Sequence, residues 1–468
     1  MLPFPFQSSA APGWARFSLH ALRTITLAGL CLLGATAMAA SEPLQDSMLA
    51  NGMRVLIQPD HRAPVAVVQV WYRVGGIDEP AGKTGISHLV EHMMFKGTPA
   101  LPAGGYSKLL SSLGGSDNAY TTPDHTYYYS KVPAQQLSRI LGVEADRMQN
   151  LLFDATAFKL EKSVVEEERR WRVDDNSYGE FYEKLAASAF GKHPYANPVL
   201  GWPEDFSSIT LEDARAWYQR WYTPANATVI VLGDVEPQAA LAEVQRAFGG
   251  IKSRPLPERA MPPTPPQDAM QKHTIPVPAD RPLVVLQWRV PTLQTDEADK
   301  RTYALAMLAE LLDNDPYTLE YEVAERVNGL SVSYTGMSRG FGEFTISATP
   351  GKGRSTEEVA KALQRQMALL RSSTLHTESV DHGKLNWASK NAFASDSMLD
   401  RATTLGRTVM YGFPPDYLSR MQTQIDKVTA ADLVSTAKEL LTEDRMTIGI
   451  LEPTERVARK HQGAIHAR

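Results

Sequence analysis

Cysteine is almost absent from this chain of 468 residues, in which Cys31 is the single example. One cysteine supports neither a disulfide within the chain nor a thiolate metal cluster, so any metal site must use His, Asp or Glu. A basic excess is also missing, because 48 Lys and Arg face 53 Asp and Glu and give a formal net charge of −5. Without a basic field the chain lacks the charge pattern of nucleic-acid-binding proteins. We therefore expect no nucleic-acid partner.

Long apolar runs are missing too, apart from one stretch near the N-terminus. Arg16 and Arg23 lie before an apolar segment, Thr24–Ala39. This segment ends in Ala37-Met38-Ala39. A charged region, a short apolar region and a small-x-small site are, in that order, typical of a secretory signal peptide. The run is short for a membrane span. We expect export, to the periplasm, and no stable membrane span after cleavage; a retained N-terminal anchor is the alternative.

Two segments of the chain resemble each other. Thr210 and Thr429 are each followed by an acidic first turn, a helix, a short break and a buried apolar strand. The two strands end near Glu236-Pro237 and Glu452-Pro453. The threonines are 219 residues apart, and this spacing predicts two homologous domains.

A proline-rich stretch, which includes Pro255, Pro257 and Pro262-Pro263-Thr264-Pro265-Pro266, separates the two segments and predicts an extended linker. The expected order is a signal peptide at 1–39, an N-terminal domain at 40–252, the linker at 253–272, a C-terminal homologous domain at 273–455 and a tail at 456–468.

The secondary-structure pattern indicates the α+β class. Val65–Val74 and Tyr127–Val132 read as strands, and Leu137–Leu151 and Phe158–Val173 read as helices. Strands and helices do not alternate regularly, which favours α+β over a doubly wound sheet. We expect each domain to be a mainly antiparallel sheet packed with helices.

The segment His88-Leu89-Val90-Glu91-His92 has the form H-x-x-E-H. On a helix, His88 and His92 project from one face, one turn apart, so both imidazoles can bind one Zn²⁺. Glu91 lies on the same side and is the expected general base. Thr84 is the expected N-cap of this helix, and Gly97 with Thr98-Pro99 is expected to end it. An accidental match on a solvated helix face is the alternative.

A catalytic zinc site needs a third protein ligand and an open position. The glutamate-rich segment 161–171 supplies candidates, among which Glu161 and Glu168 are seven residues apart on one helix face. One of the two would bind metal while the other orients a histidine ligand. Spacing alone does not choose among Glu166, Glu167 and Glu168.

The sequence resembles the pitrilysin, insulinase and mitochondrial processing peptidase family of zinc peptidases, in its short two-domain bacterial form. The resemblance is carried by Leu49–Gly52, Val74–Pro80, Thr84–Thr98, Gly114–Thr121, His193–Tyr195 and Gly233-Asp234. It implies one zinc ion per chain, with Glu168 as the third ligand, Glu161 as the acid behind a histidine ligand, and Glu167 as the fallback for the ligand. It also implies that Asn118 and Ala119 lie on an exposed sheet edge, where a peptide adds as an extra strand; an ordinary turn and strand is the alternative.

One departure from the family concerns an Arg and a Tyr, seven residues apart, that steady the scissile carbonyl in active relatives. Aligned on Gly329-Leu330, these positions hold Glu325 and Val332, which offer no such donor. We expect a homologous partner subunit to supply the pair. A homodimer that uses Arg326 and Tyr334 is the alternative.

The expected function is zinc-dependent endopeptidase action on unfolded peptides or small proteins, with Glu91 as the base. Two alternatives stay open: a non-catalytic or assembly subunit of a two-chain complex, and a peptidase dedicated to one precursor peptide.

Overall fold

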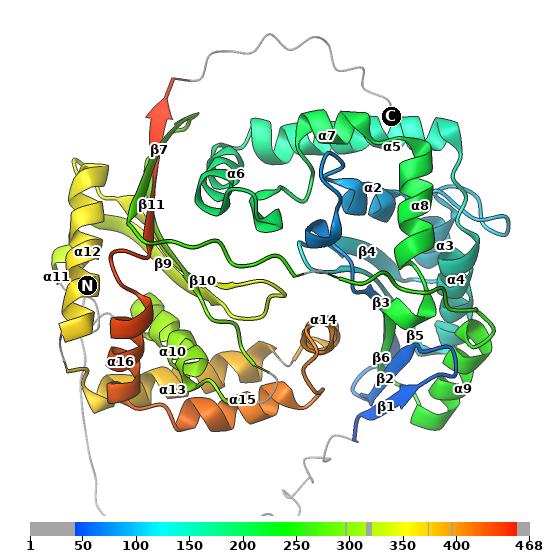
Figure 1. Ribbon diagram of the computed structural model, residues 1–468. Helices are drawn as coiled ribbons and strands as arrows, with labels where there is room; N and C mark the ends of the chain where they lie inside the picture. The colour runs from blue at the N-terminus through cyan, green and yellow to red at the C-terminus, as the bar shows by residue number, and fades with distance from the viewer. Residues whose placement is uncertain are drawn as a thin grey trace, which may run out of the picture. The chain divides into compact units, whose positions relative to one another are not determined.

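Two β-sheets with the same internal order form the framework of the protein (Figure 1). The computed structural model describes residues 43–259, 261–294, 297–314, 321–372, 374–394 and 396–455, so the predicted signal peptide and tail lie outside the described residues. The described residues from Leu44 onward form one unit. Among them, every helix is too short or too polar to cross a lipid bilayer.

The first sheet is six-stranded. In spatial order its strands are β1 (Gln45–Met48), β2 (Arg54–Pro59), β6 (Ala227–Gly233), β3 (Val65–Tyr72), β5 (Thr126–Pro133) and β4 (Ser116–Thr121). The β2–β6 pair is parallel and the other pairs are antiparallel. β4 pairs only with β5 and therefore forms one edge of this sheet.

The second sheet is five-stranded and repeats this arrangement without the counterpart of β1. Its strands, in spatial order, are β7 (Gln271–Pro278), β11 (Met446–Thr454), β8 (Leu283–Val290), β10 (Gly342–Pro350) and β9 (Val327–Thr335). Here too the first pair, β7–β11, is parallel and the others are antiparallel. The predicted α+β class with mainly antiparallel sheets is confirmed.

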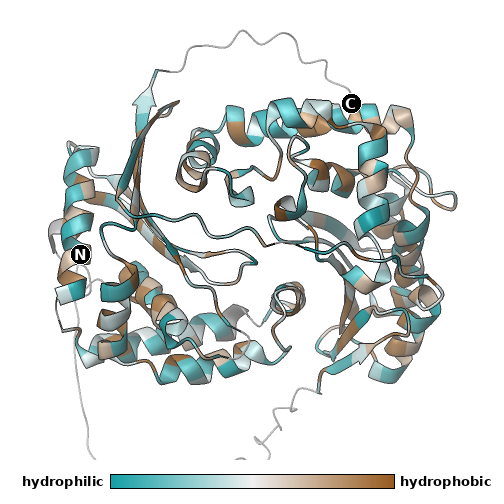
Figure 2. Cartoon of the chain, in the orientation of Figure 1, coloured by the Kyte–Doolittle hydropathy of each residue, from teal (hydrophilic) through white to brown (hydrophobic). Residues whose placement is uncertain are grey.

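Helices cover both sheets, and most carry polar and apolar residues on different faces (Figure 2). Those before the linker are α2 (Ile86–Met93), α3 (Gly105–Ser112), α4 (Leu137–Asn150), α5 (Ala155–Arg169), α6 (Ser177–Phe190), α7 (Pro203–Ser208), α8 (Leu211–Trp221) and α9 (Pro237–Phe248). Those after it are α10 (Lys300–Asn314), α11 (Tyr321–Ala324), α12 (Thr356–Ser372), α13 (Thr377–Ala394), α14 (Met398–Met410), α15 (Tyr417–Asp426) and α16 (Ala430–Leu440).

The helices of the internal repeat have matching caps. Thr210 and Thr429 are the N-caps of α8 and α16, and each hydroxyl accepts from the backbone N–H of the aspartate three residues later. The aspartate carboxylates return the contact to the threonine N–H, which completes a capping box in both places. The predicted elements at 65–74, 127–132, 137–151 and 158–173 correspond to β3, β5, α4 and α5, the last continued by a π-helix at Arg170–Asp174.

The two halves exchange one helix each. α6 precedes the linker but packs on the second sheet, where Phe181 and Leu185 contact Val285 of β8 and its neighbours. α14 follows the linker but packs on the first sheet, where Ala402 and Val409 join the cluster around Trp71 of β3. The spacing of 219 residues carries α6 onto 396–409, which nearly coincides with α14, so the exchange follows the repeat.

This exchange explains why the central strands are apolar on both faces. In β3, Val68 and Val70 belong to the main core of the first half, while Val67 and Trp71 face the α14 cluster. The boundaries of the predicted domains stay a prediction, and β7 includes Gln271 and Lys272, the last two residues of the expected linker.

Candidate metal centre

The helix that carries the H-x-x-E-H motif begins at Ile86, one residue after a glycine. Gly85 has φ of 88°, and a Cβ there would lie 2.7 Å from the Leu200 carbonyl oxygen, so the position requires glycine. The carboxylate of Glu79 accepts from the backbone N–H groups of Gly85 and Ser87 and satisfies the start of the helix. The prediction that Thr84 is the N-cap is therefore wrong.

Thr84 instead connects α2 to the segment around α7, because its hydroxyl donates to Asp205 and accepts from the backbone N–H of Trp202. α2 also ends at Met93, earlier than the expected stop at Gly97. On α2, Leu89, Val90 and Met93 are fully buried in the core of the first half. The opposite side of α2 holds His88, Glu91 and His92.

α5 brings Glu168 to the two histidines. Glu168 Oε2 lies 3.2 Å from His92 Nε2 and 3.8 Å from His88 Nε2. The three donor atoms all lie within 4.8 Å of one another, and among the described residues this is the group of three whose geometry suits a metal ion. The structure thus brings together the three residues predicted as metal ligands.

The donor set fits zinc. Two imidazole nitrogens and one carboxylate oxygen are typical catalytic zinc ligands, and tetrahedral bonds of about 2.0–2.1 Å place ligand atoms roughly 3.3 Å apart. The observed separations of 3.2 and 3.8 Å to the Glu168 oxygen are close to that value. Three ligands leave the fourth position of a tetrahedron open.

The charges around the donor atoms suit a cation. Burial would lower the pKa of His92, but hydrogen bonds to Glu161 and Glu168 outweigh it and raise that pKa to about 9. Burial, with His92 nearby, lowers the pKa of His88 to about 3, so His88 is neutral and keeps a lone pair for a metal. The pKa of Glu168 is lowered, and the hydrogen bond from His92 is the largest cause. Without a metal, a proton on His92 therefore supplies the positive charge that balances the two carboxylates. Metal binding would release this proton.

Glu161 lies behind His92. Its Oε2 is 3.2 Å from His92 Nδ1, and its Oε1 pairs with Lys96 Nζ at 2.6 Å. A carboxylate on the far nitrogen of a histidine ligand fixes the ring and its tautomer. Glu167 instead points to solvent, where it pairs with Arg170.

Glu91 is buried beside the donor atoms. Burial raises its pKa, while the hydroxyl of Thr121 donates to Oε2 at 2.5 Å. Thr121 is the last residue of β4, so the edge strand of the sheet contacts the carboxylate directly. Thr121 belongs to the sequence pattern shared with the family, but that pattern did not predict this contact.

Asn118 and Ala119 lie on the same edge strand. Asn118 is exposed, and its side-chain oxygen accepts from the backbone N–H of Ala119. That N–H is therefore bonded locally on a strand whose outer side has no strand partner in the described sheet. Both residues lie on the edge strand, as expected, although the Ala119 side chain itself is buried.

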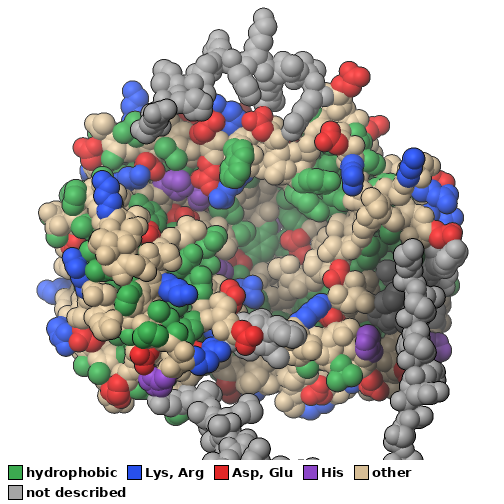
Figure 3. Space-filling view, turned by 180° about the vertical axis from the view of Figure 1, so that it is seen from behind, with side chains coloured by type: hydrophobic (Ala, Val, Ile, Leu, Met, Phe, Trp, Pro, Cys, Tyr) green, Lys and Arg blue, Asp and Glu red, His purple; other side chains and the backbone are tan. Residues whose placement is uncertain are grey.

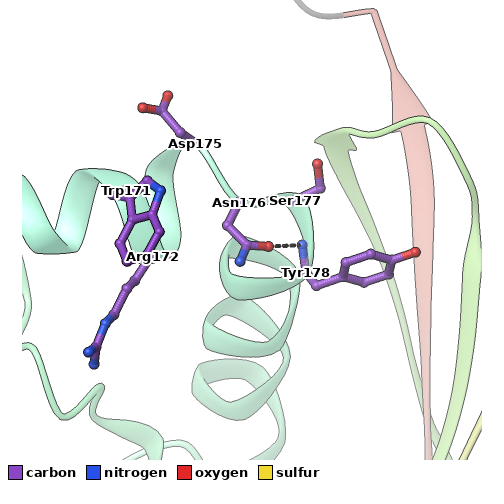
Figure 4. Close-up of a pocket in the computed structure, with 6 residues that line it drawn as sticks. All are labelled: Trp171, Arg172, Asp175, Asn176, Ser177 and Tyr178. Carbon is purple, nitrogen blue, oxygen red and sulfur yellow. Dashed lines mark hydrogen bonds between the residues drawn. The ribbon is translucent and has the colours of Figure 1, made fainter.

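A cavity of about 380 Å³ lies at the segment that follows α5 (Figure 4). Its lining comes from the π-helix after α5 and from the start of α6, and consists of Trp171, Arg172, Asp175, Asn176, Ser177 and Tyr178. The guanidinium of Arg172 also pairs with Glu168 Oε1 at 2.7 Å. Arg172 thus links the cavity to the third donor residue, a contact that the sequence analysis did not foresee.

The positions aligned with the expected Arg/Tyr pair are not built for that role. Glu325 is exposed, and Val332 is buried in the core of the second half. Tyr334 lies on β9 next to that core, and its hydroxyl donates to the Pro291 carbonyl oxygen at 2.7 Å. In the homodimer alternative, Tyr334 would have to leave Pro291 before donating to a substrate.

Comparisons with known proteins identify the family of this chain. Residues 54–202 match the family described as insulinase (peptidase family M16), and residues 208–386 match the peptidase M16 inactive domain. The zinc protease PqqE of Helicobacter pylori is 29% identical over 455 residues, which cover 93% of this chain and 99% of that protein.

Solved structures share the fold of this chain. The crystal structure of a protease from Helicobacter pylori has a TM-score of 0.80 at 27% identity, over 88% of this chain and 100% of that chain. The periplasmic protease PqqL of Escherichia coli shares the fold with a TM-score of 0.76 at 20% identity, over 89% of this chain and 48% of that one. The chain belongs to the insulinase family of zinc proteases, peptidase family M16.

Proposed function

We propose that this protein is a zinc-dependent endopeptidase that hydrolyses peptide bonds in unfolded peptides or small proteins. The observation that supports this most is the convergence of His88, His92 and Glu168 beside the buried carboxylate of Glu91. His88, His92 and Glu168 would hold one zinc ion per chain. When bound, zinc would supply Lewis acidity toward the scissile carbonyl.

Glu91 takes the role of general base. Its burial favours the protonated form, so the carboxylate binds a proton more readily than an exposed glutamate does. Thr121 fixes one carboxylate oxygen and leaves the other to accept a proton from the attacking water. Glu161 orients the His92 ring through Nδ1.

The edge strand β4 is the proposed binding element for substrate. A peptide that adds to β4 would exchange main-chain hydrogen bonds with it, and the Ala119 N–H would turn from Asn118 to the peptide. Such binding reads the backbone first, which suits an enzyme for unfolded chains. Figure 3 shows a hollow bordered by hydrophobic side chains on the back face, with Lys and Arg scattered among Asp and Glu around it.

The test combines metal analysis with peptide cleavage. Wild-type protein should contain about one zinc per chain and cleave an unfolded peptide, and chelation should stop cleavage. Glu91→Gln should keep the zinc and lose about 10²–10⁴-fold in rate, the usual effect of removing a general base. Glu166→Gln, an exposed position on α5, is the matched control and should behave as wild type. A zinc-free wild type that takes up no zinc would refute the proposal.

We further propose export to the periplasm and a homologous partner subunit. The N-terminal signal pattern supports export, and the relative PqqL is itself a periplasmic protease. The unsuitable Glu325 and Val332 support a partner that supplies the missing Arg/Tyr pair. Glu325 and Val332 equally favour the second candidate function, a non-catalytic assembly subunit. A peptidase for one precursor peptide is the narrower enzymatic alternative.

Expression with and without the candidate partner tests the division of labour. The lone chain should bind zinc and cleave slowly, and a related chain that carries the Arg/Tyr pair should raise kcat by about 10²-fold or more, as expected for a carbonyl-stabilising donor. Full activity of the monomeric lone chain would contradict the partner. Activity of a lone-chain dimer that falls with Tyr334→Phe would favour the homodimer.

A further inference from the structure

Arg339 crosses from the second half of the chain into the first. It lies in the connection between β9 and β10, and its two terminal nitrogens reach both oxygens of Asp78 at 2.7 and 2.8 Å. Both side chains are only 5% exposed. A buried, bidentate pair of this kind is strong and fixes the relative orientation of its partners.

The same arginine also holds the turn between β4 and β5. Its backbone N–H donates to Asp124 Oδ2, and its side chain donates to the Asp124 carbonyl oxygen, each at 3.3 Å. The Asp124 carboxylate is buried and accepts further bonds from the hydroxyls of Tyr195 at 2.7 Å and Tyr411 at 3.0 Å. Tyr411, which follows α14, comes from the second half as well.

Both segments that Arg339 holds lead directly to the metal centre. Asp78 ends the short helix Gly76–Asp78 (η1), and the next residue is Glu79, whose carboxylate satisfies the start of α2. The β4–β5 turn begins after Thr121, whose hydroxyl fixes Glu91. The Thr122 and Pro123 carbonyl oxygens accept from backbone N–H groups of η1, so turn and short helix form one bonded unit.

We propose that Arg339 is a positioning residue for the reaction: it holds the Thr121–Glu91 contact and the start of α2 in place from the second half of the chain. The inference rests on the proposed function. It gives a role in the chemistry to a segment, within 208–386, that the family comparison describes as an inactive domain. The role depends on geometry, because Arg339 makes no contact with a metal-donor residue among its described interactions.

Arg401 offers a matched control. It pairs with buried Asp60, which follows β2, at 2.5 Å, and therefore also joins the two halves. Asp60 belongs neither to η1 nor to the β4–β5 turn. Arg339→Gln should keep the zinc content of wild type and lower kcat by about tenfold to 10²-fold, as displacements near 1 Å do. Arg401→Gln should stay within about twofold; an equal kcat in the two variants, both measured below their unfolding temperatures, would overturn the proposal.

A double-mutant cycle separates positioning from general weakening. Thr121→Val removes the hydroxyl that fixes Glu91. If Arg339 acts through this contact, adding Arg339→Gln to Thr121→Val should cost far less than Arg339→Gln costs alone. Adding Arg401→Gln should leave the Thr121→Val rate within about twofold. If the fold-losses in kcat of Arg339→Gln and Thr121→Val simply multiply in the double variant, Arg339 does not act through the Thr121–Glu91 contact.

Amide hydrogen exchange on the full-length, metal-free protein gives a readout without activity. Arg339→Gln should raise the exchange rates of η1 and of residues 121–126 by at least about tenfold, while Arg401→Gln leaves them at the wild-type rates. Unchanged exchange in Arg339→Gln would overturn the inference even if the wild type cleaves peptides. If the wild type proves inactive but Arg339→Gln still exchanges faster than it, the bracing contact is supported and only the proposed function is contradicted.

Discussion

Glu167 and Glu168 are neighbours on α5 with opposite surroundings. The Glu168 side chain is 16% exposed and faces the two imidazoles, whereas the Glu167 side chain is 67% exposed and pairs with Arg170. Successive helix residues point about 100° apart, so a shift of one residue in register would exchange these environments. The choice between the two glutamates is therefore a direct test of the donor set.

Glu168→Gln should lose most bound zinc, since a neutral amide replaces a carboxylate ligand and leaves two histidines. Glu167→Gln should retain about one zinc per chain and unchanged activity. Metal content after dialysis against a weak chelator measures the difference. Full zinc in Glu168→Gln together with loss in Glu167→Gln would show that the register is off by one.

At this scale the sequence predicted the donor residues better than their surroundings. His88 and His92 are separated by one helical turn, so local geometry alone places both imidazoles together. Periodicity could not choose Glu168, and the family resemblance supplied it. Thr121 contacts Glu91 across 30 residues, and Arg339 contacts Asp78 across 261 residues. No local sequence pattern predicts contacts over such separations.

Gly406 shows how closely the exchanged helix α14 packs on the first sheet. A Cβ at Gly406 would lie 2.1 Å from an atom of the Trp71 ring. On the other sheet, a Cβ at Gly449 of β11 would lie 2.6 Å from Leu185 of α6. Each exchanged helix therefore meets its sheet at a glycine contact that admits no larger residue without movement.

Gly406→Ala should lower the free energy of unfolding by about 1–3 kcal/mol, because overpacking against the fixed indole outweighs the better helix propensity of alanine. The matched control is Gly142→Ala in α4, where the added Cβ meets no atom within 4 Å. That variant should gain up to about 1 kcal/mol. Chemical denaturation followed by tryptophan fluorescence measures both, and equal effects of one sign would contradict the packing argument.

Element positions followed from periodicity, but their ends depended on contacts far along the chain. Thr84 has the right chemistry for an N-cap, yet Asp205 and Trp202 bind its hydroxyl, and Glu79 satisfies the helix start instead. The near-continuous apolar run at 65–74 predicted a strand, but it did not show what covers the two faces of that strand. That α14, more than 300 residues later, supplies the second face was beyond any local pattern.

The exchange of α6 and α14 makes the two halves depend on each other. Without α14, the first sheet would expose a buried cluster that comprises Leu56, Val67, Trp71, Ile230 and Leu232. At about 1.5–3 kcal/mol for each side chain, this exposure costs at most roughly 8–15 kcal/mol. That sum rivals the total stability of about 5–15 kcal/mol of a typical protein.

A fragment that ends at residue 259 should therefore fail to fold into a stable monomer, although the sequence repeat marks its boundary. Full-length protein should unfold in one cooperative transition, since neither half retains a complete core after the other has melted. Calorimetry of the full chain and size-exclusion chromatography of the fragment measure this. The fragment alone should aggregate or remain partly unfolded, and co-expression with residues 261–455 should restore a soluble complex that binds zinc. Two results would contradict this: a monomeric fragment with native zinc affinity, or two well-separated unfolding transitions in the full chain. Either would show that the first half folds independently. The exchanged helices would then add only affinity between the halves.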